Sequence, residues 1–184
     1  MAGVTWRLIL WGGLLATAYF VFDRVCLDYA RRGKLSRTMA ALQTGYFFIY
    51  ALSSYAFLDS NLLRIQVRGI CLFLAVLLMV VGVLTVLASM PILGQRSFGE
   101  QVGKLHTRGI YRYTRNPQLI GGFLFLVGYG WLWPHWLGAI WVLLWLPISA
   151  WMVRAEEEHL WRIFGSEYEA YCQAVPRFFR LRKK

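Results

Sequence analysis

The stretch LHTRGIYRYTRNP, from Leu105 to Pro117, is polar and rich in arginine, yet it lies between two apolar runs of membrane length. A second polar stretch, RAEEEHLWRIFGSEYEAYC, runs from Arg154 to Cys172 directly after the last apolar run. Only an apolar hairpin and a short turn separate the two stretches. Charged side chains at the border of a bilayer are costly and usually mark a functional site. The sequence therefore predicts a membrane protein whose site is built from these two stretches.

The amino-acid composition indicates the class of protein to which this chain belongs. The chain has 184 residues, of which 58% are hydrophobic. This fraction is too high for an ordinary soluble domain, and the length indicates a single domain, residues 1–184. The cysteines lie far apart and form no metal-type spacing such as CxxC. We therefore predict no metal site and free thiols at Cys26, Cys71 and Cys172.

Five apolar runs approach the length of about 20 residues that a helix needs to cross the hydrocarbon core. They are Val4–Phe22, Met39–Leu58, Val67–Ile92, Leu119–Trp133 and His135–Val153. The last two form a hairpin whose tip is Trp133–Trp136. The first run lacks a small-residue cleavage site and is expected to remain as a span. The predicted fold is an all-α integral membrane protein with about five transmembrane helices, followed by a C-terminal cytoplasmic amphipathic helix.

The distribution of Lys and Arg predicts the orientation. The segments after the first and third runs, together with the C-terminal tail, carry 17 of the 20 basic residues. Basic loops face the cytoplasm, so we expect the N-terminus outside and both the C-terminus and the active site inside. The net charge of +11 then reflects loops that face anionic lipid. Nucleic acid is not an expected partner.

The loop from Leu93 to Pro117 is long and rich in glycine, and loops of this length are often functional. Pro117 disfavours helix at the residue before it and is well suited to open a helix. Arg115 and Asn116 are therefore predicted to lie at the N-terminal end of the fourth span. Free backbone N–H groups and the helix dipole favour a carboxylate or phosphate at such an end.

The segment after the last run has the periodicity of an amphipathic helix, interrupted at Gly165 and ended by Pro176. Its apolar stripe consists of Leu160, Trp161, Phe164, Tyr168, Tyr171 and Cys172. Glu156 and Glu157 are four residues before members of this stripe and are predicted to face the protein. Glu158 is four residues from both Arg154 and Arg162 and is predicted to form a solvated ion pair.

Other polar residues of the loop have simpler interpretations. Arg108 and Arg112 are read as anchors at the membrane border whose apolar stems extend along the bilayer. Tyr113 is read as an aromatic residue of the interface. His106 has two possible interpretations. It is either a loop residue without a functional role or a hydrogen-bond donor to the carboxylate of a ligand.

The motif GIYRYTRNP with Gly121, followed by EE-x-x-L-x-x-x-FG-x-x-Y-x-x-Y-x-x-x-VPRF, resembles the isoprenylcysteine carboxyl methyltransferase and phospholipid methyltransferase group of membrane enzymes. The resemblance covers about residues 70–180. It implies a helical membrane core that binds S-adenosylmethionine on the cytoplasmic side, between the loop and the C-terminal helix. It also implies a lipophilic or lipidated substrate that enters from the bilayer. Residues 67–184 would then form the cofactor-binding catalytic core, and residues 1–66 two N-terminal spans.

The resemblance also assigns residues, motif position by motif position. Predicted catalytic residues are Arg115, Asn116 and Glu157. Predicted cofactor-binding residues are His106, Gly109, Tyr111, Arg115, Pro117, Glu156 and Glu157. The family often has His where Asn116 stands and Tyr where Leu119 stands, and an Asn side chain cannot act as a general base. A carboxylate such as Glu156 or Glu157 suits the hydroxyls, amine and cationic sulfur of the cofactor, whereas Arg115 suits an anionic group.

Two other functions remain open. The pattern of Tyr168, Tyr171, Cys172 and Val175–Pro176 is also similar to membrane sterol reductases, which use NADPH. The small size of the chain and the adjacent pair of glutamates favour methyl transfer. A non-catalytic membrane scaffold is the second alternative, and it would bind neither cofactor. The acceptor could be an isoprenylcysteine-like carboxylate or a phospholipid-like amine, and the oligomeric state is open.

Overall fold

The computed structural model describes residues 2–58, 64–97 and 105–178. Every regular element within these ranges is helical, which confirms the all-α prediction for this part of the chain. The helices are α1 (Ala2–Arg32), α2 (Arg37–Leu52), α3 (Ser54–Phe57), α4 (Gly69–Ser97), the 3-10 helix η1 (Gly109–Arg112), α5 (Pro117–Trp131), α6 (Trp136–Leu143), α7 (Trp145–Phe164) and α8 (Ser166–Ala174).

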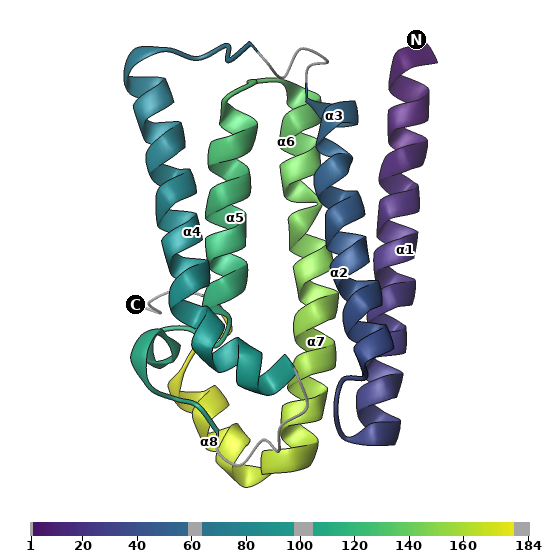
Figure 1. The fold of residues 1–184 in the computed structure, drawn as a ribbon, viewed down its shortest axis with the longest axis vertical. Coiled ribbons are helices and arrows are strands. Elements are labelled where there is room, and N and C mark those ends of the chain that lie inside the picture. Colours follow the sequence, from purple (N-terminus) through teal and green to yellow (C-terminus); the bar gives the residue numbers. More distant parts are fainter. Residues whose placement is uncertain (1, 59–63, 98–104, 179–184) are drawn as a thin grey trace.

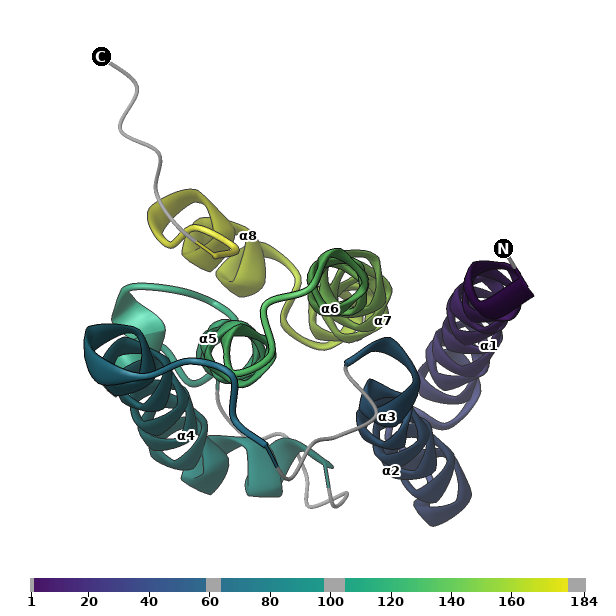
Figure 2. The same ribbon diagram turned by 90° about the horizontal axis from the view of Figure 1, so that it is seen from above.

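The long helices run lengthwise beside one another, and α8 lies across one end of the bundle (Figure 1). Viewed from above, α6 and α7 form one column, with α1 on one side and α5 and α8 on the other (Figure 2). The two polar stretches of the sequence, in η1 with the loop before α5 and in α7 with α8, therefore meet at one end of the molecule.

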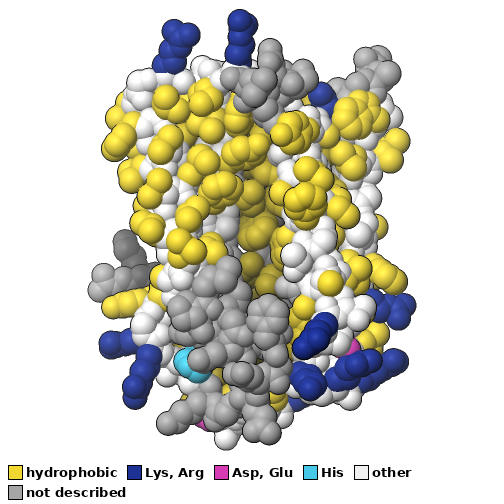
Figure 3. Space-filling view, in the orientation of Figure 1, with side chains coloured by type: hydrophobic (Ala, Val, Ile, Leu, Met, Phe, Trp, Pro, Cys, Tyr) yellow, Lys and Arg dark blue, Asp and Glu magenta, His cyan; other side chains and the backbone are white. Residues whose placement is uncertain are grey.

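Within the described part of the chain, three helices are long and apolar enough to cross a membrane, namely Thr5–Arg32, Gly69–Ser89 and Trp136–Phe164. They correspond to the first, third and fifth predicted spans. The helices α2 and α5 have 16 and 15 residues and are therefore only about 24 Å long. Five spans thus stay a prediction. On the face shown in Figure 3, hydrophobic side chains cover the middle, and Lys and Arg gather at the two ends.

The helix ends differ from the predicted span ends at several places, among them the ends of α1 and α7. α1 continues past Phe22 and ends at Arg32. The next residue, Gly33, has φ +66°, and its backbone N–H donates a hydrogen bond to the Tyr29 carbonyl. The segment from Arg154 to Phe164 is no separate amphipathic helix but the continuation of α7. Hydropathy marks the border of the bilayer, whereas backbone hydrogen bonding decides where a helix ends.

Small residues set the distance between α4 and α5. A Cβ added to Gly82 would lie 2.5 Å from the Gly121 carbonyl, and one added to Gly128 would lie 2.5 Å from the Ala75 carbonyl. Such contacts let two helix backbones approach closely in a membrane. Because Pro117 opens α5, this packing also determines where the predicted site residues Arg115 and Asn116 lie.

The break between α7 and α8 is at Gly165, as the sequence predicts. Gly165 has φ +47° and ψ −118°, a conformation that essentially only glycine adopts. No heavy atom lies within 4 Å of a Cβ built there, so a substitution meets backbone strain alone.

We expect Gly165→Ala to lower the free energy of unfolding by about 1–3 kcal/mol, because alanine must be held in that conformation. Denaturant unfolding in detergent micelles measures the change. Gly12→Ala in α1 is the matched control, since nothing lies within 4 Å there and its backbone is helical. Equal stability of Gly165→Ala and the wild type would show that the break does not require glycine.

Candidate functional site

Three hydrogen bonds join the start of α5 to the chain that follows α8. The Thr114 hydroxyl and the Asn116 side-chain amide each donate to the Arg177 carbonyl at 3.1 Å. The backbone N–H of Arg115 donates to the Pro176 carbonyl at 3.0 Å. The Arg-Asn-Pro element and the Val-Pro-Arg-Phe element, which lie far apart in the sequence, are therefore held side by side.

Asn116 is the residue before the first turn of α5, and Pro117 is the first residue of the helix. This confirms the predicted helix start. The Asn116 carbonyl accepts from the N–H groups of Leu119 and Ile120, and the residue is only 5% exposed. Its side-chain amide does not cap the helix, because it is directed to the Arg177 carbonyl. Asn116 therefore joins two segments of the chain through its side-chain N–H group.

Glu157 lies between two arginines. Its carboxylate is 3.1 Å from Nη1 of Arg115, and it accepts hydrogen bonds from Nε of Arg177 at 3.1 Å and from Nη2 of the same residue. The side chains of Arg115 and Glu157 are each 12% exposed. We refer to Arg115, Glu157 and Arg177 as the ion cluster. With two cations and one anion it carries a net charge of +1, which favours an additional anion nearby.

The Arg115 guanidinium also contacts α8. Its Nη1 is hydrogen-bonded to Cys172 Sγ and lies 3.5 Å from the Tyr168 hydroxyl. Burial, and then the negative charge of Glu157, raises the pKa of Tyr168 above its ordinary value. The phenol therefore keeps its proton at neutral pH. Arg115 is thus held from two sides, by a carboxylate on α7 and by polar groups on α8.

A cavity of about 420 Å³ that is open to the surface lies between the loop before η1 and α8. Its wall includes Thr107, Arg112 and Glu167, together with Tyr171. The Tyr171 hydroxyl donates to the Tyr111 carbonyl at 2.8 Å and so ties α8 to η1. A hydroxyl, a guanidinium and a carboxylate around one cavity of this size are typical of a small-molecule site.

The structure brings together Arg115, Asn116, Pro117 and Glu157 of the predicted site residues. Glu156 precedes Glu157 on α7 and is half-buried. His106 lies between two residues of the cavity wall, Leu105 and Thr107. Gly109 begins η1 at φ +63°. Tyr111 is fully buried, so it anchors η1 in the core. Contact of any of these residues with a cofactor remains a prediction.

Several residues of this region were not among the site residues that the sequence predicts for a methyltransferase, namely Thr107, Glu167, Tyr168, Cys172 and Arg177. The sequence contains a signal that could have identified Arg177 as a site residue, because Arg177 belongs to the Val-Pro-Arg-Phe element of the motif. Arg112, read as a membrane-border anchor, lines the cavity. The predicted pair of Glu158 with Arg154 is confirmed at 2.9 Å.

Comparison with known proteins identifies the family. The family model for phospholipid methyltransferases matches residues 66–167, which is more than half of the chain and includes Arg115 and Glu157. Searches of curated proteins and of solved structures gave no match. This match agrees with the resemblance of the two polar stretches to the isoprenylcysteine carboxyl methyltransferase and phospholipid methyltransferase group. The chain therefore belongs to the phospholipid methyltransferase family.

Proposed function

We propose that this protein transfers a methyl group from S-adenosylmethionine to a lipophilic or lipidated acceptor in the membrane. The observation that carries the proposal is the ion cluster of Arg115, Glu157 and Arg177, in a chain of a methyltransferase family. The helix α8, which contacts Arg115, also lines the cavity. The acceptor would be an isoprenylcysteine-like carboxylate or a phospholipid-like amine.

The residues around the cavity fit the proposed cofactor. S-adenosylmethionine has a carboxylate, an ammonium, ribose hydroxyls and an aromatic base. Arg112 suits the carboxylate, Glu167 the ammonium and Thr107 a hydroxyl. Near the start of α5, Nε of Arg115 and Oε1 of Gln118 are among the buried polar atoms that have no hydrogen-bond partner within the described ranges.

Methyl transfer requires the protein mainly to bind the cofactor and the acceptor and to orient them toward each other. When bound, the cofactor supplies a methyl group on a cationic sulfur, and in-line displacement by the acceptor depends mainly on proximity. Glu157 holds the two guanidinium groups in position, and Arg115 and Arg177 attract an anionic group of the cofactor or acceptor. A carboxylate acceptor needs no general base, which agrees with Asn at position 116.

The proposed topology has five spans, with the N-terminus outside and the C-terminus and site in the cytoplasm. The basic residues support this orientation. Residues 67–184 contain the ion cluster and the cavity and would form the catalytic core. Residues 1–66 would border the lipid through which the acceptor enters, so membrane lipids are the expected surroundings and partners.

Calorimetric titration of detergent-purified protein tests the proposal. We expect saturable binding of S-adenosylhomocysteine and none of NADPH. Arg112→Gln should weaken the binding roughly ten-fold through the loss of a charged hydrogen bond. Arg108→Gln is the matched control, because Arg108 is exposed and precedes η1.

Each other outcome would overturn the assignment. Binding of NADPH alone would identify a reductase. A folded protein that binds neither compound would be a scaffold. Equal affinities of the two arginine variants would exclude the cavity beside Arg112 as the cofactor site.

A further inference from the structure

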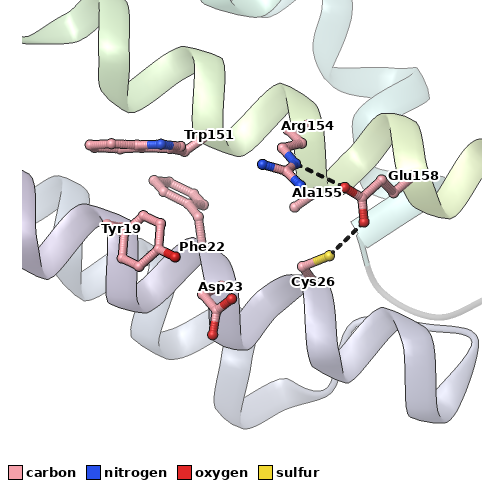
Figure 4. A pocket seen from close by; sticks show the side chains of 8 residues that line it. All are labelled: Tyr19, Phe22, Asp23, Cys26, Trp151, Arg154, Ala155 and Glu158. Atoms are coloured by element: carbon pink, nitrogen blue, oxygen red, sulfur yellow. Dashed lines mark hydrogen bonds and ion pairs between the residues drawn. The ribbon is translucent and has the colours of Figure 1, made fainter.

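The helices α1 and α7 are joined by pairs of side chains along one side of α7. The rings of Tyr19 and Trp151 meet edge to face at 5.7 Å, and Cys26 Sγ donates a hydrogen bond to the Glu158 carboxylate at 3.0 Å (Figure 4). The column of α6 and α7 separates α1 from α5 and α8 (Figure 2). The interface of α1 and α7 is therefore distinct from the ion cluster, and nothing in the proposed methyl transfer uses it.

A buried histidine belongs to this interface. His159 of α7 is only 8% exposed, and its imidazole is stacked on the Tyr29 ring of α1, with 4.1 Å between the ring centroids and 21° between the planes. Tyr29 belongs to a cluster whose other side chains are uncharged and come from α1, α2, the turn between them and α7, namely Val25, Cys26, Leu35, Met39, Ala40 and Ala155. In such surroundings a neutral imidazole is favoured over a charged one.

A positive charge on His159 would have no counterion in the described part of the chain. His159 forms no hydrogen bond or ion pair with a described residue. On α1, the Asp28 carboxylate, next to Tyr29 in the chain, is bound to Nε of Arg32 at 3.1 Å. On α7, the Glu158 carboxylate is bound to Arg154. Both carboxylates are therefore already neutralised by arginines.

The electrostatic surroundings of His159 disfavour its protonated form. The predicted fifth span ends at Val153, so His159 lies about 9 Å beyond that span along α7. Glu156 and Arg162 are each three residues from His159, and the charge of Arg162 acts on the imidazole. Burial, and then this positive charge, lowers the pKa of His159 below its ordinary value. Stacking on the Tyr29 ring attracts an imidazolium, but this attraction is weaker than the cost of burying an unpaired charge.

Protonation of His159 is therefore linked to the contact between the two helices. At pH 7.5 the imidazole is mostly uncharged whether α1 is docked or not, so the contact keeps its full strength. As the pH falls through the ordinary pKa of histidine, about 6.5, an undocked His159 takes up a proton that the docked one resists. Mild acid thus favours the undocked state.

We propose that the stacked pair of His159 and Tyr29 is a pH-sensitive contact that docks the C-terminal half of α1 on α7. Protonation of His159 releases this half of α1 and exposes Cys26, which lies one helical turn before Tyr29 and contacts Glu158 in the docked state.

Alkylation of Cys26 tests the proposal on the full chain in detergent. The rates of reaction with N-ethylmaleimide are measured for Cys26 and for Cys71, on α4, by peptide mass spectrometry at pH 7.5 and at pH 5.5. Well below the pKa of a thiol, the thiolate fraction falls with pH by the same factor for every cysteine, so the ratio of the two rates reports the exposure of Cys26. We expect this ratio to be several-fold higher at pH 5.5.

The variants separate His159 from other groups that titrate. In His159→Phe a ring remains opposite Tyr29 but binds no proton, so the ratio should be the same at both pH values. His159→Gln, which does not titrate either, gives the same test if the larger ring is not accommodated. His135→Asn is the matched control and should keep the wild-type response. It removes a histidine at the other end of the column of α6 and α7, and asparagine can still accept the hydrogen bond from the Leu137 N–H. A cooperative unfolding transition at pH 7.5 reports that each variant is folded.

Three results would overturn the proposal. The first is a wild-type ratio that does not change with pH. The second is an increase that persists in both His159 variants, which would assign the response to another titrating group. The third is loss of the increase in His135→Asn. None of these measurements involves a cofactor, so the proposed methyl transfer is tested separately by the binding of S-adenosylhomocysteine.

Discussion

Glu157→Gln is expected to lower the free energy of unfolding by roughly 3 kcal/mol and to weaken binding of S-adenosylhomocysteine. Glu157 is the carboxylate between Arg115 and Arg177, and the Arg115 side chain is only 12% exposed. Without Glu157, Arg115 would keep a largely buried positive charge that water cannot solvate. Denaturant unfolding in detergent measures the stability, and calorimetry measures the affinity.

The two arginines should respond differently. Arg177 is 48% exposed, so its removal should cost only about 0–1 kcal/mol. In a double-mutant cycle, Arg115→Gln should recover part of the loss caused by Glu157→Gln, because no largely buried unpaired charge then remains and the exposed Arg177 is solvated by water. Glu169→Gln, an exposed position on α8, controls for the change in net charge. Additive effects of Glu157→Gln and Arg115→Gln would contradict the proposed coupling.

Gly121→Ala is expected to destabilise the protein by about 1–3 kcal/mol through overpacking. The added Cβ would lie 2.6 Å from the Gly82 carbonyl and 3.0 Å from side-chain atoms of Thr85 and Val86. The backbone of α4 cannot yield without moving the helix. Because α5 begins at Pro117, we also expect the displacement to disturb Arg115 and to weaken binding of S-adenosylhomocysteine.

The control for Gly121→Ala is Gly45→Ala in α2. Nothing lies within 4 Å of a Cβ at Gly45, so alanine there should be neutral or stabilise the helix by up to about 1 kcal/mol. Unfolding of both variants in detergent gives the comparison. Similar stabilities for the two variants would mean that α4 and α5 do not depend on this close approach.

Local signals in the sequence predicted several features correctly. Pro117 predicted a helix start because proline fixes its own φ and lacks an N–H group. Gly165 predicted the break after the long helix because glycine can adopt a positive φ at little cost. The spacing of four residues predicted the pair of Glu158 with Arg154. The first apolar run predicts a membrane span as far as Phe22, whereas the helix α1 continues beyond it through charged residues to Arg32.

The sequence by itself determined that the chain is helical, that it contains apolar helices of membrane length, and that Glu157 faces the protein. These properties follow from composition and from helical periodicity, which are local. The tertiary structure alone decided the partners. Glu157 meets Arg115 and Arg177, and Glu158 meets Cys26, because helices distant in the chain pack beside α7. Periodicity gives the face of a helix but not the side chain opposite it, since that depends on which helices come together.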